Sequence, residues 1–497
     1  MKWALYNLLF AAVYPFLLPG FLLRMLRRGG YAARMGDRFA LYPEELRSGI
    51  SSGASDSRRA GWIWIHAVSV GEVQVAGQLM REWRKAEPDV RFCFSTTSST
   101  GWKIAEKELK DIGAQCSTSN LQPSTSDVLI YNPLDFPNFV KSALRTVRPR
   151  AIVLTESEIW PNFIRTAKKM GIPLFLINAR VSDRSAPRYK AAKWFFGEVL
   201  SCFTKIFAQS DLDKARLVAA GAPADKVEVT GSFKFDVARR NEDKDRELRD
   251  WIFGKREEGR GKREEGSENR GDAKILLGGS TWPGEDEILL RIYKKLLTSS
   301  LFPLPSSLLL VIAPRHFEKA DAVEANIRKA GFACIRRSLG SKSKDEVEQW
   351  KEQFHCSPST KDFDYPPVYL ADTTGELMGL YGIADVVFVG KSLCAHGSQN
   401  MIEPCLCGKP TLVGPYTENF RPVMSDLLAS DAIIQVKDAE ELERKMVELL
   451  GSSDLRGRDA PAPCNSQALQ FGERAKAAVE KRLGVVAKCV SEIRGAL

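Results

Sequence analysis

Short apolar runs rich in β-branched and aromatic residues alternate with amphipathic stretches along most of this chain of 497 residues. The first series begins at Trp62 with WIWIHAV and continues through RFCFSTTS, AIVLTES, IPLFLINAR and KIFAQS. Apolar runs separated by helical patterns indicate parallel strands joined by helices, which is a doubly wound α/β sheet. A second series predicts a second Rossmann-like unit and comprises KILLGGST, LLLVIAPRH, FACIRRS, PVYLADT, DVVFVGKS, KPTLVGP and AIIQVKD.

The alternation stops between Lys244 and Asp272. The centre of this segment, GKREEGRGKREEGSE, is a charged near-duplication with no apolar face, which predicts a disordered linker or loop. We therefore expect an N-terminal unit over 24–243, a linker over 244–272, a C-terminal unit over 273–467 and a final helix over 468–497 that packs back on an earlier element.

The segment before residue 24 has a different character. WALYNLLFAAVYPFLLPGFLL, from Trp3 to Leu23, contains no charged residue, and as a helix it would be roughly 30 Å long, about the thickness of a hydrocarbon core. We expect a membrane-anchor helix over 1–23. One lysine precedes it and several arginines follow it, so we expect the body of the protein on the cytoplasmic side of the membrane. Two prolines and a glycine leave open a helix that lies in one leaflet.

Composition excludes few classes of function for this chain. A net charge of +10 favours anionic partners such as phosphates, acidic lipid or nucleic acid, and charge alone does not choose among them. The ten cysteines have no zinc-binding spacing, and the closest two are Cys405 and Cys407. The chain also has neither a G-x-G-x-x-G fingerprint after a strand nor a G-x-x-x-x-G-K-[ST] loop.

Glu72 follows the strand at Trp62 and begins a helix in an otherwise small and apolar turn. An acid in the first helical turn offsets the positive end of the helix dipole, and this purely structural explanation is the more common one. Two further acids, Glu156 and Glu158, follow another strand, and we expect only one of them to reach a given cleft. Lys234, in GSFKFD, is either a cation for a phosphate or an ordinary exposed lysine.

The second unit carries polar residues where its strands end, the usual place for ligands in such sheets. The turn GGST, at Gly278, either directs N–H groups at an anion or caps a helix. Arg315 is placed to grip a phosphate or to pair with Glu318. Asn400 and Glu403 have the spacing of a capping box, and the same spacing presents Glu403 to ribose hydroxyls.

Seven motifs occur in order over roughly residues 1–450: HAVSVGE, TESEIWPN, NARVSDRS, GSFKFD, APRH, GELMGLYGIAD and FVGKSL followed by NMIEP. Together they resemble the 3-deoxy-D-manno-octulosonic acid (Kdo) transferases of lipopolysaccharide assembly. The resemblance implies a GT-B architecture, in which two Rossmann-like domains face a central cleft. It also implies an inverting transfer of Kdo from CMP-Kdo to the 6′-hydroxyl of a lipid A precursor, lipid IVA.

The resemblance assigns roles to individual residues. Glu72 matches the general base, and Glu156 and Lys234 match groups that stabilise the transition state. The positions that match CMP contacts are Pro314, Arg315, Thr374, Gly375, Glu376, Asn400, Met401, Ile402 and Glu403. One departure concerns His396: the family usually reads Gly-Gly-His-Asn before the last motif, whereas this chain reads HGSQN.

A metal-dependent transferase would carry D-x-D at a strand end. DLD at Asp211 begins a helix instead, and DFD at Asp362 lies at the edge of an insertion, so we expect neither a metal nor a cofactor. The expected partners are CMP-Kdo, the lipid A precursor and the inner membrane, and no nucleic acid. The alternative is a non-catalytic membrane protein whose basic surface binds anionic lipid or RNA, and specific binding of CMP would separate the two.

Overall fold

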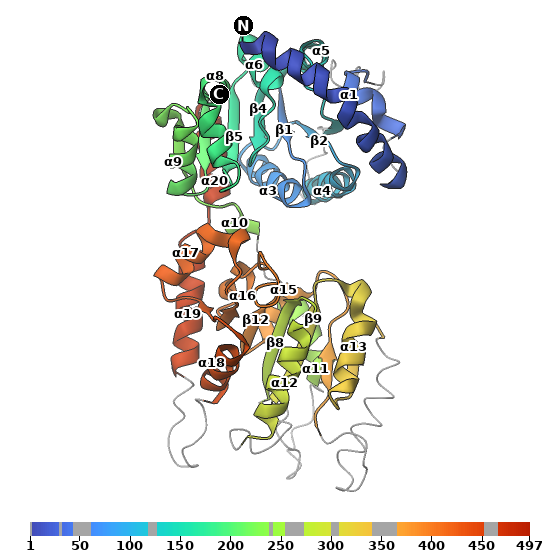
Figure 1. Ribbon diagram of the computed structural model, residues 1–497, viewed down its shortest axis with the longest axis vertical. Helices are drawn as coiled ribbons and strands as arrows, with labels where there is room; N and C mark the ends of the chain where they lie inside the picture. The colour runs from blue at the N-terminus through green and yellow to red at the C-terminus, as the bar shows by residue number, and fades with distance from the viewer. Residues whose placement is uncertain are drawn as a thin grey trace. The chain divides into compact units, whose positions relative to one another are not determined.

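The computed structural model describes residues 2–28, 32–42, 61–117, 127–237, 242–253, 273–299, 308–339, 365–451 and 466–497. These residues form two compact units. Unit 1 comprises Met1–Val237 together with Gly484–Leu497, and unit 2 comprises Ala238–Leu483. Each unit contains one parallel sheet with helices on both faces, as the two series of apolar runs predict (Figure 1).

The sheet of unit 1 has seven strands in the order β3-β2-β1-β4-β5-β6-β7, and all its pairs are parallel. The strands are β1 (Trp62–His66), β2 (Phe92–Thr96), β3 (Val128–Tyr131), β4 (Pro149–Thr155), β5 (Leu174–Ala179), β6 (Lys205–Ala208) and β7 (Val227–Val229). Every residue of β1, β2 and β5 is buried, which explains why these strands appear as continuous apolar runs with no polar alternation.

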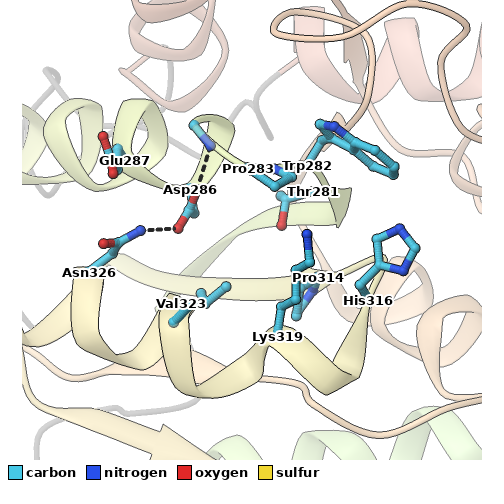
Figure 2. A pocket seen from close by; sticks show the side chains of 12 residues that line it. Thr281, Trp282, Pro283, Asp286, Glu287, Pro314, His316, Lys319, Val323 and Asn326 are labelled. Carbon is cyan, nitrogen blue, oxygen red and sulfur yellow. Dashed lines mark hydrogen bonds between the residues drawn. The ribbon is translucent and has the colours of Figure 1, made fainter.

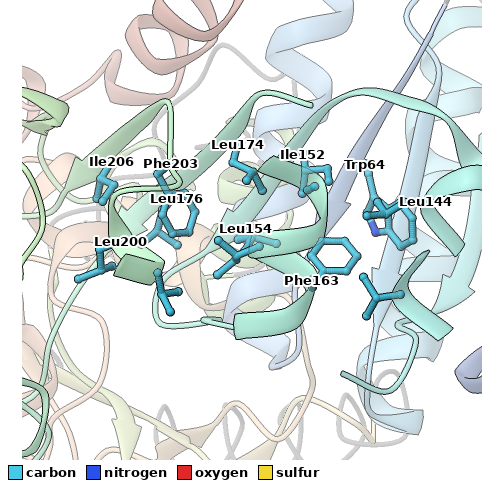
Figure 3. Close-up of a cluster of buried hydrophobic side chains, with 14 of the residues drawn as sticks. Trp64, Leu144, Ile152, Leu154, Phe163, Leu174, Leu176, Leu200, Phe203 and Ile206 are labelled. Atoms are coloured by element: carbon cyan, nitrogen blue, oxygen red, sulfur yellow. The ribbon is translucent and has the colours of Figure 1, made fainter. Parts of the chain in front are cut away.

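Helices cover both faces of this sheet. They are α1 (Lys2–Arg28), α3 (Val70–Ala86), α4 (Ser99–Ser117), α5 (Pro137–Val147), α6 (Pro161–Lys169), α7 (Ala186–Ala191), α8 (Lys193–Leu200), α9 (Asp211–Ala219), α10 (Lys234–Val237) and α20 (Val485–Gly495). On one face, residues of α5, α6 and α8 pack on strand side chains such as Trp64 and Leu154 (Figure 3). On the other face, α3, α4 and α20 do so.

The sheet of unit 2 also has seven strands, in the order β10-β11-β9-β8-β12-β13-β14. They are β8 (Lys274–Thr281), β9 (Leu308–Pro314), β10 (Cys334–Arg336), β11 (Val368–Leu370), β12 (Val386–Val389), β13 (Thr411–Val413) and β14 (Ile434–Gln435). The helices of this unit are α11 (Glu242–Phe253), α12 (Glu285–Leu297), α13 (Ala320–Lys329), α15 (Leu377–Ile383), α16 (Ile402–Leu406), α17 (Arg421–Ala429), α18 (Ala439–Gly451) and α19 (Ser466–Glu480).

The predicted linker over 244–272 is wrong for its first ten residues, which belong to α11. This helix has an apolar face because Leu248 and Ile252 recur at helical spacing, and both side chains are buried. Leu248 packs closely against Gly379 of α15. The repetitive charged centre of the segment lies outside the described residues.

The C-terminal segment forms two helices, whereas one was expected over 468–497. The first, α19, belongs to unit 2, and the chain then turns at Gly484, which has a φ of +84° that glycine tolerates. The second, α20, returns to unit 1, where Asp236 accepts hydrogen bonds from the backbone N–H groups of Gly484 and Val486, each at 2.7 Å. Two carboxylate bonds thus hold the first turn of α20.

The N-terminal segment is helical over Lys2–Arg28, but a membrane-spanning anchor is not supported. Among the helices of the described residues, none combines the length and the apolar character needed to cross a bilayer. The first turns of α1 are bound to unit 1: Trp3 is buried and donates from Nε1 to Glu198, and Tyr6 donates to Asp135 at 2.9 Å. A segment with these contacts lies on its own domain.

Candidate functional site

In unit 1, candidate residues follow the carboxyl ends of neighbouring parallel strands. Glu72 lies in the first turn of α3, after β1, and Glu156 directly follows β4. Arg180 directly follows β5, and Lys234 begins α10 after β7. Because β1 and β4 are adjacent while the chain proceeds from β1 to β2 on the other side, Glu72 and Glu156 flank the topological switch point of this sheet. Ligands of doubly wound sheets bind at such points.

The carboxylate of Glu72 is held by three donors. Ser69 Oγ donates to Oε1 at 2.8 Å, the backbone N–H of Val68 donates to Oε2 at 3.0 Å, and Thr155 Oγ1 lies 3.2 Å from Oε2. Ser69 also accepts from the backbone N–H of Glu72, so its side chain caps the start of α3. The side chain is 8% exposed. Glu72 therefore serves the helix terminus and is at the same time a rigidly oriented carboxylate at the switch point.

Glu156 is the second buried acid of this cluster. Its backbone has a φ of +50°, a left-handed conformation that is uncommon outside glycine and that clusters at functional sites. Arg180 Nε lies 2.7 Å from Oε2, and Asn178 Nδ2 donates to Oε1 at 3.3 Å. Burial raises the pKa of Glu156, Arg180 lowers it, and the nearby carboxylate of Glu72 raises it again. Two acids and a cation therefore share one site.

Lys234 adds a second cation to the cluster. Burial lowers the pKa of its ammonium group, and neighbouring Glu156 opposes that change. The side chain is half-buried, so the alternative of an ordinary exposed lysine is wrong. The opposite effects of Glu156 on Lys234 and of Lys234 on Glu156 indicate that the two groups lie close enough to interact.

Glu158 has other partners, as expected for two acids that a turn separates. Its Oε2 accepts from Trp160 Nε1 at 3.0 Å and lies 3.7 Å from Nε2 of the buried His66. Glu156 is therefore the acid of this pair that joins Glu72, Arg180 and Lys234.

In unit 2, a hollow of about 120 Å³ lies at the carboxyl ends of β8, β9 and β11. Its lining includes Ser280, Pro314, Arg315, Phe317 and the segment Thr373–Leu377. Five of the predicted CMP-contacting residues line it, namely Pro314, Arg315, Thr374, Gly375 and Glu376. Motifs about 60 residues apart in the chain thus meet at one place.

Arg315 has no ion pair within the part of the chain that the structure describes. Glu318, the predicted structural partner, lies 3.2 Å from Nδ1 of His316 instead. The backbone N–H of Arg315 donates to the carbonyl of Thr281 at 3.1 Å, which holds its strand end beside β8. An exposed guanidinium on a fixed backbone at the mouth of a hollow is suited to a phosphate.

The carboxylate of Glu376 is bound by other side chains of the protein. Arg337 donates to both carboxylate oxygens, at 3.0 and 3.1 Å, Lys244 lies 3.3 Å from Oε1, and Thr373 donates from Oγ1. Despite its burial, these donors lower the pKa of Glu376. The exposed residues beside it are Thr373, Thr374 and Gly375, and the φ of +81° at Gly375 suits glycine. A ligand therefore meets the backbone of this turn, and the carboxylate of Glu376 holds the turn in place.

Asn400 and Glu403 do not line this hollow, and they bond to each other. Asn400 Nδ2 donates to Glu403 Oε1 at 2.9 Å, while Asn400 Oδ1 accepts from the backbone N–H of Ile402 at 3.1 Å. Burial raises the pKa of Glu403. Met401 and Ile402 are fully buried, so any contact that they make with a nucleotide comes from their backbone.

His396, the displaced histidine of the last motif, contacts Glu418 and Tyr416. Its Nδ1 lies 2.8 Å from Oε1 of Glu418, its ring packs on Tyr416 at 4.0 Å, and the side chain is largely exposed. The structure therefore gives it a local role in the turn that precedes Asn400.

A second hollow of about 140 Å³ lies between α12 and α13 (Figure 2). Thr281, Trp282, His316 and Lys319 line it, and the indole and imidazole rings are 5.0 Å apart. Deeper in the hollow, Asp286 accepts from Asn326 Nδ2 at 2.8 Å and from the backbone N–H of Gly284 at 3.1 Å. Thr281 and His316 belong to the motifs GGST and APRH, whereas the other lining residues named here were not predicted from the sequence.

Two basic residues of the sites were also missed. Arg180 lies in the motif NARVSDRS, which contributed to the resemblance without a role for this residue. Arg337, in FACIRRS, was seen only as part of a strand. Both arginines follow strands, so their place at the edge of a sheet could be predicted from the sequence. Their pairing with Glu156 and Glu376 could not, because it depends on contacts between distant segments.

Solved structures show how the fold relates to known proteins. Anabaena Alr3699/HepE in complex with UDP superimposes with a TM-score of 0.51 at 11% identity, covering 88% of this chain and 100% of that chain. A glycosyltransferase from Rickettsia africae superimposes with a TM-score of 0.50 at 12% identity, covering 87% and 97%. These similarities concern the fold alone.

Sequence comparisons identify the family. Residues 33–237 match the family model of 3-deoxy-D-manno-octulosonic-acid transferase (kdotransferase). A 3-deoxy-D-manno-octulosonic acid transferase of Bordetella pertussis is 32% identical over 82% of this chain and 83% of that protein. Another, of Haemophilus influenzae, is 30% identical over 86% of both chains. This protein therefore belongs to the Kdo transferase family and is a glycosyltransferase.

Proposed function

We propose that this protein transfers Kdo from CMP-Kdo to the 6′-hydroxyl of lipid IVA, with inversion at the anomeric carbon and release of CMP. The observation that carries the proposal is the position of Glu72, the family's base, as an oriented carboxylate beside Glu156 at the switch point of unit 1. The two α/β units fit a GT-B architecture, which we propose with the activity.

An inverting displacement needs one base and a stabilised leaving group. In the proposed reaction, Glu72 accepts the proton of the acceptor hydroxyl as its oxygen bonds to the anomeric carbon. The bond from that carbon to the CMP phosphate breaks, and CMP leaves with the electron pair. Lys234, with Glu156 beside it, supplies fixed charges where charge develops, and Arg315 binds the phosphate.

The alternative of a non-catalytic binder of anionic lipid or nucleic acid does not fit a chain that belongs to a transferase family. The proposal is tested by measuring CMP release from CMP-Kdo with and without lipid IVA. We expect release that depends on the lipid. Release that ignores the lipid, or tight binding of every polyanion with no preference for CMP, would contradict it.

Replacing Arg315 with alanine is expected to weaken CMP binding by about 1.5–3 kcal/mol, because a hydrogen bond to a charged group is removed. Isothermal titration with CMP checks this change. The matched control is Arg328→Ala, which removes an arginine of α13 that pairs with Glu324 on the same helix. Equal CMP affinities in the two variants would remove Arg315 from the nucleotide site.

For the location, we propose that α1 lies on the cytoplasmic surface of the inner membrane. One face of α1 packs on unit 1, where Phe10 contacts Phe136 and Tyr6 stacks on Phe195. The opposite face presents a stripe of exposed apolar side chains, namely Leu5, Leu8, Leu9, Val13 and Phe16. Phe16 alone is 85% exposed, and such a stripe on a helix suits the interfacial region of a bilayer.

Replacing both Leu8 and Phe16 with aspartate is expected to lower binding to anionic vesicles, since each side chain contributes about 1.5–3 kcal/mol when buried in an apolar phase. Both are exposed, so the fold is retained. Co-sedimentation with the vesicles measures the effect, and Leu212→Asp, at an exposed leucine of α9, is the control. Undiminished binding by the double variant would exclude this face of α1.

A further inference from the structure

Glu285 occupies the switch point of unit 2. It begins α12 after β8, and β12 lies beside β8 in the sheet although the chain proceeds from β8 to β9 on the other side. The loop that follows β12 starts at Gly390 and leads to Asn400. Glu285 thus stands between the turn after β8 and the loop that carries the last predicted nucleotide motif.

The carboxylate of Glu285 is completely buried and accepts five backbone hydrogen bonds. Oε2 accepts from Trp282 at 2.8 Å and from Lys391 at 2.8 Å. Oε1 accepts from Ser392, Leu393 and Cys394, at 3.1, 3.0 and 3.3 Å. Two carboxylate oxygens have about four lone-pair positions, so these donors use the whole accepting capacity of the group.

This arrangement requires a negatively charged acceptor. Successive backbone N–H groups such as those of 391–394 form a nest that attracts an anion, and here a side chain of the protein fills it. The fit is close: a Cβ added to Gly390 would lie 2.8 Å from Oε2 of Glu285 and 2.3 Å from the carbonyl oxygen of Ser280. Lys391 has a φ of +55°, a conformation that needs such support in a residue other than glycine.

Backbone hydrogen bonds connect the start of the loop 390–399 to the residues just before Asn400. Gly390 donates to the carbonyl of Gly279 at 2.9 Å, and Gln399 donates to the carbonyl of Gly390 at 3.1 Å. Ser398 donates to the carbonyl of Lys391 at 2.7 Å. Asn400 follows directly, so its backbone is tied, through this short ladder, to the loop end that Glu285 holds.

We propose that Glu285 is a positioning residue for nucleotide binding: its buried carboxylate clamps the loop 390–399 to the turn after β8 and so places Asn400 and Glu403. This inference rests on the proposed binding of CMP-Kdo by unit 2. Glu285 occupies the same place relative to its sheet as Glu72 does, but with no exposed surface it acts on the loop and not on a substrate.

The test compares Glu285→Gln with Glu287→Gln, which makes the same chemical change at an exposed acid of the same helical turn. The amide of glutamine cannot accept five donors and brings two N–H groups of its own. We expect the Kd for CMP and the KM for CMP-Kdo to rise about tenfold or more in Glu285→Gln, equivalent to the loss of one charge-assisted bond. The KM for the lipid stays unchanged, and Glu287→Gln behaves as wild type.

Amide hydrogen exchange at 391–394 is measured on the same proteins without nucleotide. Faster exchange in Glu285→Gln supports the clamp, and exchange and CMP affinity equal to wild type in the folded variant overturn it. If Glu285→Gln does not fold, Glu285→Asp, which keeps the charge and shortens the reach, is judged by the same two readouts. A wild-type protein that binds no CMP would contradict the proposed function, while the exchange measurement would still decide on the clamp.

Discussion

Replacing Glu72 with glutamine is expected to lower the rate of Kdo transfer by about 10²–10⁴-fold while the protein stays folded, the range typical of a lost general base. Glutamine keeps the shape of the side chain and its carbonyl oxygen can still accept from the N–H of Val68, so α3 should lose about 1 kcal/mol or less. It cannot take a proton from a hydroxyl at neutral pH. CMP affinity should stay unchanged, because the predicted nucleotide contacts belong to unit 2.

The capping role of Glu72 calls for a matched control. Ser69→Ala removes the hydroxyl that bonds to Oε1 and caps α3, but it leaves the carboxylate in place. It should cost about 0.5–2 kcal/mol of stability and reduce transfer far less than Glu72→Gln does. If thermal unfolding and transfer rates rank the two variants the other way, the carboxylate serves the helix and is not the base.

Replacing Lys234 with methionine should reduce transfer by about 10²–10³-fold, as expected when one preorganised charge near the reacting groups is lost. Methionine retains most of the apolar stem, so the packing of α10 persists. The control is Lys169→Met, at an exposed lysine of α6. Steady-state rates with saturating CMP-Kdo measure the effect, and a loss confined to the KM of the donor would make Lys234 a binding group only.

The pH dependence gives Lys234 a second signature. Burial lowers the pKa of its ammonium group, so the charge is lost as pH rises through a value below that of an ordinary lysine. We expect transfer to decline over the same range. In Lys234→Arg the guanidinium remains charged there, so residual transfer should persist to higher pH. Identical alkaline profiles would assign the decline to another group.

The fold could be predicted from the sequence because both sheets are parallel and buried. Strands such as β1 and β5 are buried along their whole length, which turns them into continuous apolar runs. α6 begins at Pro161, where proline suits the first helical position. The α11 segment was missed because its two buried residues, Leu248 and Ile252, are few beside the charged repeat that follows.

The prediction of a membrane-spanning helix is not supported, for a different reason. Length and lack of charge describe 3–23 equally well as a spanning helix or as a helix that lies on a surface. The decisive contacts are those of Trp3 with Glu198 and of Tyr6 with Asp135, residues more than 100 positions away in the chain. No local pattern contains that information.

For the two sites as well, the sequence predicted some features and not others. Position after a strand made Glu72, Arg315 and the pair Glu156 and Glu158 candidates, because parallel strands end at one edge of a sheet. The choice of Glu156 and the role of Glu72 came from the family resemblance. The sequence could not show which side chains already have partners or are buried. Glu376 accepts a hydrogen bond from Arg337, and Met401 is fully buried. Glu285 was missed because an acid in the first turn of a helix is ordinary, and only its five backbone partners set it apart.

The most direct measurement is the mass of the lipid after the purified full-length protein has been incubated with CMP-Kdo and lipid IVA. The proposed function predicts that the lipid gains one or more Kdo residues, with one CMP released for each. The Glu72→Gln variant, folded and still binding CMP, should leave the lipid almost unchanged over the same time. A folded, CMP-binding wild-type protein that adds no Kdo to the lipid would contradict the proposed function.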